Sequence, residues 1–551
     1  MKRLRDRPLG RPFFASPRIW LLFICLVLVI ACGQTPVPGT PTTSQPGADL
    51  PPSATLSQTH PSTFTIALEY AIPGLASAYA PTGLTYAKPQ PIFGLWGLIE
   101  PSPGKPNWDP LDNLVHEYQA AGFSGIQLLI SAESPWASLD PPGLLNPGNS
   151  FPKDEYIDEY KDFVRNFVER YDGDGVDDAP GLLYPIHHYG IEREFTGYWP
   201  SDADDYIRLL RMAYPVIHEA DPLAEVLVVA ILMVDVFDGN PDAAELQQRL
   251  VTPQRGIRKS VPEIRKVLAA CDVYDILDFH SLGDYTEIPS TAAWLRSELQ
   301  SYGCDEKPLW VGDAFSMSAL VGYGGRPAWP GTDENLEQVI ATLKMIAAPS
   351  DDGHQEAKAW LYAQMATGIV KKVVVSAGEG LLGINIGNLE DWKTGIPSAD
   401  ALGVPLTGAS LFMGMMDTRV TGQQVGDMLP GFRSAGDARP AYYALQLVNE
   451  MLEGFTSVEK LDLGAGVWAY RFDLPEGPLW VLWYDDGILY FPGETPATIE
   501  IELPFDGSTA LITQTPIVLG RSEVDRTTIT SSQGILPMTL GPEPIFVEVG
   551  Q

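Results

Sequence analysis

Residues 274–280 read YDILDFH and residues 309–313 read LWVGD, two short apolar runs separated by a segment long enough for a helix. A strand, a helix and a second strand in this order form the repeating unit of a parallel α/β fold. Outward from this pair, six further apolar runs alternate with helix-like segments, at residues 65–68, 92–96, 125–130, 184–194, 225–230 and 372–376. A parallel sheet closes at eight strands, so the sequence predicts an α/β fold of the (β/α)8 TIM barrel type.

The segments between these runs carry apolar residues at helical spacing. Residues 111–118 and 157–171 each place their large apolar side chains on one helix face. Ser201 followed by Asp204 resembles a capping box and predicts the start of a third helix. These faces are predicted to pack against the barrel, and we assign them no chemistry.

Beyond about residue 455 the helical spacing ends and β-rich runs remain, at residues 467–472, 479–483, 499–503 and 545–549. Short strands separated by turn residues are typical of an all-β sandwich. We therefore predict a barrel over residues 63–452 and a C-terminal β-sandwich domain over residues 453–551.

The N-terminus has the pattern of an export signal. Basic residues up to Arg18 precede an apolar run, residues 19–30, that is too short to span a bilayer comfortably. The run ends in Val29-Ile30-Ala31-Cys32, which resembles the lipobox of bacterial lipoproteins. The resemblance implies a signal peptide over residues 1–31 and a lipidated Cys32. An ordinary signal peptide with a chance cysteine is the alternative.

Residues 33–62 are dense in Pro, Thr, Ser and Gly, so residues 32–62 are predicted to form the lipidated cysteine and a flexible tether. The folded part would then lie on the extracellular face of a bacterial membrane. Cys271 and Cys304 each precede a predicted strand, and the two strands are neighbours. Because that compartment permits oxidation, we expect a disulfide between them, with two free thiols as the alternative.

The composition excludes some classes of protein. A formal charge of −34 argues against nucleic acid as a partner, because a phosphate backbone requires a basic surface. The sequence contains no phosphate-binding glycine loop, no Gly-x-Ser-x-Gly elbow and no zinc-ligand spacing. We therefore expect no required cofactor. No pattern specifies an oligomeric state.

Two predicted strands end in carboxylates, where barrel enzymes place their active sites. The fourth strand leads into Glu194 and the seventh into Asp313. Glu192, two residues before Glu194, should point the same way along a strand and is an alternative acid. Glu379, just past the predicted eighth strand, is a further candidate.

Three segments resemble retaining (β/α)8-barrel glycoside hydrolases, whose acid/base follows strand four and whose nucleophile follows strand seven. The segments are residues 96–101 (WGLIEP), 279–285 (FHSLGDY) and 439–443 (RPAYY), and the likeness covers most of residues 63–551. It implies hydrolysis of O-glycosyl bonds in an oligo- or polysaccharide. It places the acid/base at Glu194 and the nucleophile at Asp313.

The chain departs from this family at both positions. Arg193 stands where the family has an asparagine, and an Arg193 guanidinium that reached Glu194 would favour the charged carboxylate, although strand alternation aims it outward. Asp313 replaces a glutamate and is one methylene shorter, roughly 1.5 Å. Asp313 could therefore be a repositioned nucleophile, an inverting base or part of an inactive site. The function is accordingly a membrane-tethered glycoside hydrolase or, alternatively, a catalytically inactive carbohydrate-binding lipoprotein.

Several polar and aromatic side chains near strand ends are candidates for binding sugar. Tryptophans can stack on sugar faces but also pack in cores, and His280 could donate to a hydroxyl or be a core histidine. The candidates are Trp96, Trp136, Arg193, Trp199, His280, Tyr285 and Trp392.

Residues 172–178 read DGDGVDD, with acidic side chains at alternating positions and glycines for a turn. Asp172, Asp174 and Asp177 are therefore candidate ligands of a structural calcium. The segment lacks the closing glutamate of an EF-hand loop, and an acidic turn before the fourth strand is the alternative.

Overall fold

The computed structural model describes nine segments of the chain, which fall in one compact unit. They are residues 64–141, 148–233, 236–252, 259–315, 338, 341–346, 348–391, 412–421 and 431–550. Cys32, the predicted tether and Trp392 lie outside them. Within these segments, no helix combines the length and apolarity needed to cross a membrane.

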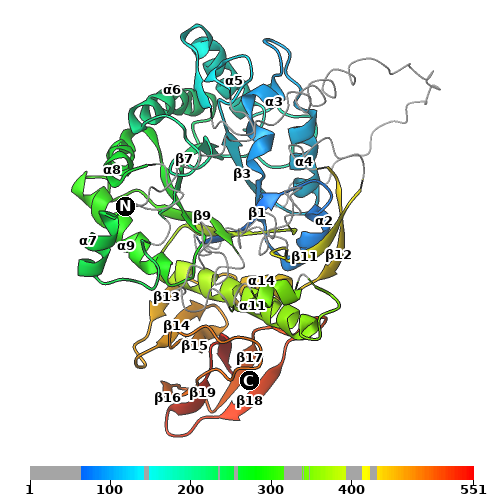
Figure 1. The fold of residues 1–551 in the computed structure, drawn as a ribbon, viewed down its shortest axis with the longest axis vertical. Helices are drawn as coiled ribbons and strands as arrows, with labels where there is room; N and C mark the ends of the chain where they lie inside the picture. The colour runs from blue at the N-terminus through cyan, green and yellow to red at the C-terminus, as the bar shows by residue number, and fades with distance from the viewer. Residues whose placement is uncertain are drawn as a thin grey trace, which may run out of the picture. The chain divides into compact units, whose positions relative to one another are not determined.

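The centre of the structure is a closed barrel in which each strand pairs in parallel with its neighbours (Figure 1). The order around the barrel is β1-β10-β9-β8-β7-β6-β3-β2. The TIM barrel predicted from the sequence is therefore confirmed. The strands are β1 (Thr65–Ala71), β2 (Tyr86–Pro89), β3 (Gly125–Ile130), β6 (His188–Ile191), β7 (Glu225–Ile231), β8 (Ile276–Ser281), β9 (Leu309–Phe315) and β10 (Gly383–Gly387).

Helices surround the barrel, as Figure 1 shows, and each long one buries an apolar face against it. The α-helices are α2 (Ala76–Tyr79), α3 (Trp96–Ile99), α4 (Asp109–Ala120), α5 (Ile157–Glu169), α6 (Ala203–Ala220), α7 (Ala243–Leu250), α8 (Val261–Ala269), α9 (Glu287–Ser301), α11 (His354–Gly378) and α14 (Pro440–Leu452). Short 3-10 helices are η1 (Ala80–Thr82), η2 (Pro91–Gly94), η3 (Asp154–Tyr156) and η4 (Cys271–Val273).

Two of the predicted strands are wrong, although the number of strands is right. The run at residues 92–96 lies in η2 and the start of α3, and the second strand is β2. Its sequence, YAKP, did not read as a strand because Lys88 interrupts the apolar pattern. Lys88 is nevertheless buried, because its ammonium lies 3.0 Å from a Glu69 carboxylate oxygen.

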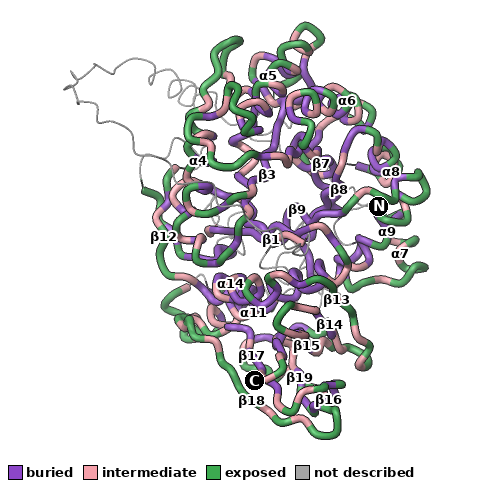
Figure 2. Tube along the Cα trace, turned by 180° about the vertical axis from the view of Figure 1, so that it is seen from behind, coloured by how far each residue is buried: buried purple, intermediate pink, exposed green. Residues whose placement is uncertain are grey.

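The run at residues 372–376 lies inside α11, and the eighth strand is β10. Three consecutive valines suggested a strand, since β-branched residues favour sheets. Tertiary packing makes these residues helical instead. Helix α11 is buried nearly all round and lies with α14 between the barrel and the C-terminal strands (Figures 1 and 2). The true strand begins at Gly383, where a Cβ atom would lie 2.7 Å from the carbonyl oxygen of Thr65.

Helix α6 begins one residue later than the capping-box pattern predicted. Its N-cap is Asp202, whose side chain accepts a hydrogen bond from the backbone N–H of Asp205 at 2.9 Å. Ser201 instead bonds to the Asp205 side chain. An aspartate at this position satisfies a free N–H group and places negative charge at the positive end of the helix.

The C-terminal region is a β-sandwich, as expected. A six-stranded antiparallel sheet, ordered β13-β14-β15-β20-β17-β18, faces a two-stranded sheet of β16 and β19. The strands are β13 (Ser457–Lys460), β14 (Val467–Leu474), β15 (Gly477–Tyr484), β16 (Ile499–Pro504), β17 (Thr509–Gln514), β18 (Arg526–Thr530), β19 (Ile535–Leu540) and β20 (Ile545–Val549). Smaller hairpins pair β4 (Ser138–Asp140) with β5 (Asn149–Pro152) and β11 (Met416–Val420) with β12 (Arg433–Ala438).

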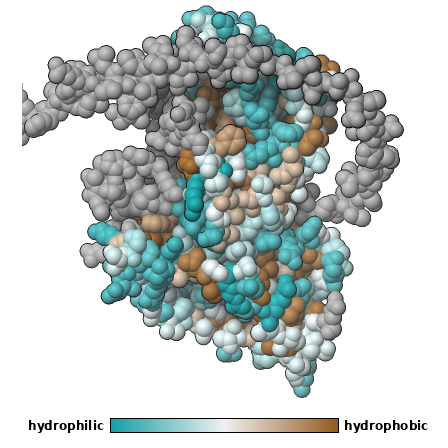
Figure 3. Space-filling model, turned by 90° about the vertical axis from the view of Figure 1, so that its right-hand side faces the viewer, coloured by the Kyte–Doolittle hydropathy of each residue, from teal (hydrophilic) through white to brown (hydrophobic). Residues whose placement is uncertain are grey.

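Both faces of the larger sheet are buried, because successive side chains on a strand point to opposite faces. Trp480 and Leu482 of β15 face the smaller sheet. Leu479, Val481 and Trp483 pack on the barrel core. On the side of the molecule drawn in Figure 3, hydrophilic and hydrophobic residues are interspersed over the described surface.

A disulfide joins Cys271 to Cys304, so this prediction is confirmed. Cys271 lies in η4 just before β8, and Cys304 follows α9 before β9. The bond therefore connects two successive units at the end of the barrel where the strands begin.

Candidate active site

Buried polar side chains collect at the carboxyl ends of the barrel strands. Glu69 and Tyr70 lie on β1, His280 on β8 and Asp313 on β9, while Glu194 follows β6. These ends lie together because parallel strands in a barrel all finish at the same rim. The structure therefore brings together Glu194, Asp313 and His280, which the sequence singled out separately.

Glu194 is buried, with only 8% of its surface exposed. Its Oε1 lies 2.7 Å from Nδ1 of His280, and its Oε2 is buried without a hydrogen-bond partner among the described residues. Gly197 packs directly against this oxygen, because a Cβ atom there would lie 2.2 Å from the Glu194 Oε2. One carboxylate oxygen is thus held by His280, and the other is buried without a partner among the described residues.

Asp313 is more deeply buried and is held by a different group. The hydroxyl of Tyr70 donates a hydrogen bond to its Oδ2, which lies 4.0 Å from Nδ1 of His280. Its Oδ1 has no partner in the described part of the chain. Burial raises the pKa of Asp313, while the positive charges of His280 and Lys88 and the Tyr70 hydroxyl oppose the rise.

His280 lies between the two carboxylates. Burial by itself would lower the pKa of this imidazole. The hydrogen bond to Glu194 and the negative charges of Asp278 and Asp313 outweigh that effect and raise the pKa to about 9. At neutral pH His280 is therefore an imidazolium that contacts both carboxylates from one nitrogen.

A layer of buried polar groups supports the site from inside the barrel. The ammonium of Lys88 contacts Glu69 and donates to the carbonyl oxygen of Gly312 at 2.8 Å. The amide nitrogen of Asn385 donates to Glu69 at 3.0 Å and to Gln127 at 2.8 Å. This layer fixes the backbone directly before Asp313.

Sequence reasoning missed Tyr70, Glu69, Lys88, Gln127 and Asn385. Glu69, Lys88, Gln127 and Asn385 are isolated polar residues on barrel strands, whereas Tyr70 follows Glu69 directly and has a φ of 60°, which interrupts strand alternation. Burial would lower the pKa of Lys88, but the carboxylates of Glu69, Asp278 and Asp313 raise it, so the ammonium keeps its charge. Gly312 also belongs to this layer, because a Cβ atom there would lie 2.0 Å from Asp278.

Asn388, directly after β10, is another residue that the sequence did not reveal. It is fully buried, and neither atom of its side-chain amide has a hydrogen-bond partner among the described residues. Buried amides are normally satisfied, so an unpaired one at a strand end is a candidate contact for a ligand.

Glu192 does not point the same way as Glu194, whereas Arg193, expected to point away from Glu194, does so. β6 ends at Ile191, and Glu192 has a φ of 64°, so alternation stops before Glu194. Glu192 accepts hydrogen bonds from the Ala132 N–H at 2.6 Å and the Ser131 hydroxyl at 2.9 Å. Burial raises its pKa to about 7. Arg193 pairs with Glu133 rather than with Glu194.

The described tryptophans singled out from the sequence lie in aromatic clusters. Trp96 is fully buried against Trp136 and Phe163 and donates its N–H to Glu100 at 2.8 Å. Trp136 is partly buried and donates to the carbonyl oxygen of Glu100. Trp199 is 2% exposed and packs on Tyr206. These contacts support a packing role for the three side chains.

Two further candidates lie away from the carboxylates. Tyr285 is buried where the barrel meets the sandwich, where it donates to Asp485 and accepts from Trp483. Glu379 caps the C-terminus of α11, so the expectation that it follows the eighth strand is wrong. Because β10 starts only after this cap, Glu379 lies at the strand-start end of the barrel, opposite Asp313.

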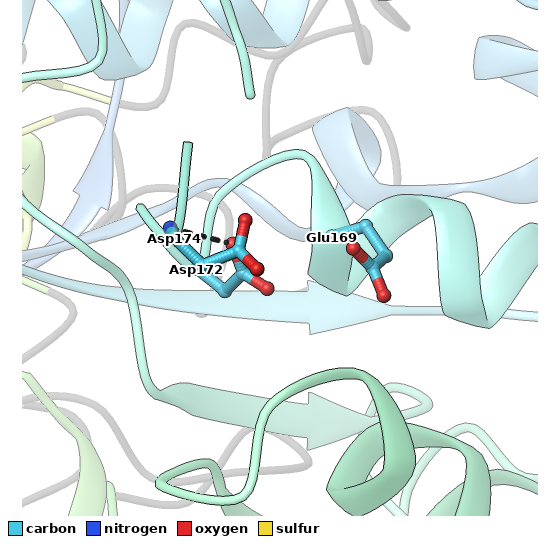
Figure 4. A group of neighbouring side chains, drawn as sticks. All are labelled: Glu169, Asp172 and Asp174. Atoms are coloured by element: carbon cyan, nitrogen blue, oxygen red, sulfur yellow. Dashed lines mark hydrogen bonds between the residues drawn. The ribbon is translucent and has the colours of Figure 1, made fainter. Parts of the chain in front are cut away.

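The predicted calcium-binding segment lies in the turn after α5. Carboxylate oxygens of Glu169, Asp172 and Asp174 lie within 4.8 Å of one another, and Figure 4 shows Asp172 and Asp174 side by side with Glu169 at the helix end. Asp177 is not part of this group, and Glu169 was not anticipated. Burial raises the pKa of Asp172 to about 6. The calcium itself stays a prediction.

Comparison with known proteins gives structural matches only. No protein-family model matches the chain, and no curated protein matches it. A family 39 glycoside hydrolase from Bacteroides cellulosilyticus is similar over 89% of this chain and 81% of its own, with 13% identity and a TM-score of 0.55.

Two further solved structures show the same fold. A monomeric beta-xylosidase from Caulobacter crescentus is similar over 88% of this chain and 95% of its own, with 13% identity and a TM-score of 0.51. A GH39 enzyme from Xanthomonas axonopodis is similar over 88% of this chain and 93% of its own, with 12% identity and a TM-score of 0.50. Likeness at this identity establishes the shared barrel-and-sandwich fold.

Proposed function

We propose that the chain is a glycoside hydrolase that cleaves extracellular oligo- or polysaccharide, with Glu194 as general acid/base and Asp313 as nucleophile. One observation carries the proposal. Two buried carboxylates from different strand ends meet at one imidazole nitrogen, and each keeps one oxygen without a partner among the described residues. The fold shared with glycoside hydrolases supports this choice of chemistry.

Glycoside hydrolysis requires one carboxyl that gives a proton to the leaving oxygen and one that stays ionised to meet the positive charge on the sugar. His280, protonated below about pH 9, holds a proton 2.7 Å from Glu194 and makes it available there. The same positive charge favours the ionised form of Asp313, as does the Tyr70 hydroxyl bond. The charge of His280 favours the ionised form of both carboxylates, so its help to Glu194 as an acid is that of a proton source.

The distance between the two carboxyl groups bears on whether the reaction retains or inverts the anomeric configuration. The two groups are about 5–5.5 Å apart in retaining enzymes and roughly 6.5–9.5 Å apart in inverting ones. Glu194 and Asp313 both reach the same imidazole nitrogen, at 2.7 and 4.0 Å. The two oxygens that face His280 are therefore no more than about 6.7 Å apart, a limit that admits the retaining separation. We propose retention, with Asp313 forming the glycosyl-enzyme intermediate and Glu194 then activating water.

The test is hydrolysis of a panel of aryl glycosides and plant polysaccharides by the purified protein, including aryl β-xylosides because one structural neighbour is a beta-xylosidase. We expect turnover that falls about 10²–10⁴-fold in Asp313→Asn. Product anomers followed by NMR then report retention or inversion.

No turnover on any substrate, together with glycan binding that survives Asp313→Asn, would contradict the proposal. It would support the alternative of a carbohydrate-binding protein that has lost catalysis. Products of inverted configuration would leave hydrolysis intact but make Asp313 a general base.

We further propose that Cys32 is lipidated and tethers the protein to the extracellular face of a bacterial membrane. The basic segment, the short apolar run and the Val29–Cys32 pattern support this proposal. Mass spectrometry of the mature N-terminus should find a diacylglyceryl group on Cys32. Cys32→Ser should abolish that modification, and an unmodified N-terminus at another residue in the wild type would contradict the proposal.

A further inference from the structure

A second pocket, of about 490 Å³, lies outside the barrel, where α11 faces the β-sandwich. Its volume falls in the range of small-molecule sites, roughly 300–1,000 Å³. None of its lining residues belongs to the group around Glu194 and Asp313. It is therefore a separate cavity, and its lining indicates what it could bind.

One wall is a single face of α11. Trp360, Gln364, Thr367 and Lys371 all line the pocket, and their spacing of three to four residues places them above one another on the helix. An indole ring, an amide, a hydroxyl and an ammonium group are thus presented in a row. An apolar helix face would be expected here if this wall served only to dock the sandwich.

The opposite wall comes from the end of β15 and the segment after it. Tyr484, Asp485 and Phe491 line the pocket from this side. The ring of Phe491 stacks on Trp360 with centroids 5.5 Å apart, and Trp360 donates its N–H to the carbonyl oxygen of Tyr490 at 2.7 Å. These contacts fix the indole ring and leave the other α11 groups to the cavity.

Three polar side chains on the α11 wall have unused hydrogen-bonding capacity. Lys371 is 6% exposed and Thr367 is 7% exposed, yet neither side chain, nor that of Gln364, makes a hydrogen bond to any residue that the structure describes. The Lys371 ammonium lies 4.0 Å from Asp485, too far for a hydrogen bond, and over the rings of Tyr285 and Trp483, at 4.9 and 5.9 Å from their centroids. Gln364, Thr367 and Lys371 line the cavity, where their polar groups can meet the hydroxyl groups of a ligand.

The charges of the lining argue against an anionic ligand. Five carboxylates line the pocket and one lysine does: Glu356, Asp485, Asp486, Glu494, Glu543 and Lys371. Rings combined with amide, hydroxyl and carboxylate groups suit a neutral sugar, whose faces are apolar and whose rim carries donors and acceptors.

We infer that this pocket is a second carbohydrate-binding site, which holds a neutral sugar unit of a glycan at the junction of α11 and the sandwich. The choice of a glycan as the ligand rests on the proposed function. The existence of the pocket and the polar side chains that line it do not depend on that function. Two sites on one chain would raise the apparent affinity for a polymer long enough to reach both.

The experiment is calorimetric titration of the purified protein carrying Glu194→Gln, so that hydrolysis of the probes is slowed. The probes are xylohexaose, cellohexaose and mannohexaose, with an oligogalacturonide as the anionic comparison. Gln364→Ala and Thr367→Val are tested singly in this background. Gln355→Ala is the matched control, because Gln355 lies on α11, is exposed and does not line the pocket.

We expect a neutral probe to occupy two sites, one of which weakens at least tenfold in Gln364→Ala and in Thr367→Val. Thr367→Ser should restore binding, since it returns the hydroxyl. Gln355→Ala should bind as the parent does. Equal affinity and stoichiometry in all of these variants, or tighter binding of the oligogalacturonide to this pocket, would overturn the inference.

The two proposals fail separately. Hydrolysis by the wild type with no effect of pocket substitutions on binding would refute only the second site. Pocket-dependent binding without hydrolysis by the wild type would refute only the catalytic proposal. Circular dichroism of each variant shows whether a loss of binding comes from unfolding.

Discussion

At the end of the barrel where the strands begin, His187 lies 2.6 Å from Asp221, and Asp275 accepts hydrogen bonds from Tyr214 at 2.9 Å and from the Val226 N–H at 2.8 Å. At the opposite end, Glu194 and Asp313 each have a buried oxygen without a partner among the described residues. The same residue types occur at both ends. The side chains named at the strand-start end have hydrogen-bond partners, whereas each of the two carboxylates at the other end has one oxygen without a partner in the described part of the chain. Buried carboxylate oxygens without partners indicate the end where a ligand would supply the missing hydrogen bonds.

The largest effect on stability is expected when the polar layer beneath the site is broken. Lys88→Met removes the cation but leaves the Glu69 carboxylate buried, which costs about 3–5 kcal/mol in comparable pairs. Urea unfolding should show this loss. Lys161→Met is the control, because Lys161 forms an exposed pair with Asp158 and should change little. Equal effects of the two substitutions would contradict the contrast between buried and exposed pairs.

The strand-start end should affect stability without affecting chemistry. Replacing both Cys271 and Cys304 by serine removes the covalent link across 33 residues and should lower the free energy of unfolding by about 2–4 kcal/mol. Turnover measured well below the unfolding temperature should not change. A parallel fall in kcat would mean that the two ends of the barrel are coupled.

The pH dependence of stability and of kcat/KM should depend on His280 at the end of the barrel that carries the site and not on His218 at the strand-start end. The folded pKa of His280 is about 9, above the ordinary value of 6.5, so its contribution to stability is complete below pH 6.5 and is lost as pH rises through 9. We expect kcat/KM to fall over the same window, because deprotonation removes the charge beside both carboxylates. His280→Gln should abolish this limb of the profile, whereas His218→Gln, at the strand-start end, should keep it. A limb that survives His280→Gln would assign it to another group.

The sequence predicted the barrel because its apolar runs alternate regularly with helical segments. Placing one run at the wrong residues does not change the count of eight strands, which is the number that closes the barrel. It misplaced β2 and β10 for physical reasons. Lys88 interrupts one strand although it is buried by pairing, and glycines at both ends of β10 weaken its apolar pattern. The valine run in α11 is helical because packing on both sides outweighs its preference for sheet.

The candidate site was predictable only in part. Glu194, His280 and Asp313 were found because they lie near or just after the ends of strands, and the structure brings them together. The roles of Tyr70 and Lys88 depend on contacts across the barrel, which no local pattern encodes. The positive φ of Glu192 changes the direction of the chain after β6, so strand alternation could not place Glu192 relative to Glu194.

The most direct test of the central claim compares two single substitutions that remove the same charge at opposite ends of the barrel. Glu194→Gln and Glu379→Gln are measured by kcat/KM on a substrate identified in the panel. The account predicts a fall of about 10²–10⁴-fold for Glu194→Gln and wild-type activity for Glu379→Gln. Comparable activity of the two variants would contradict the assignment of catalysis to the strand-end carboxylates.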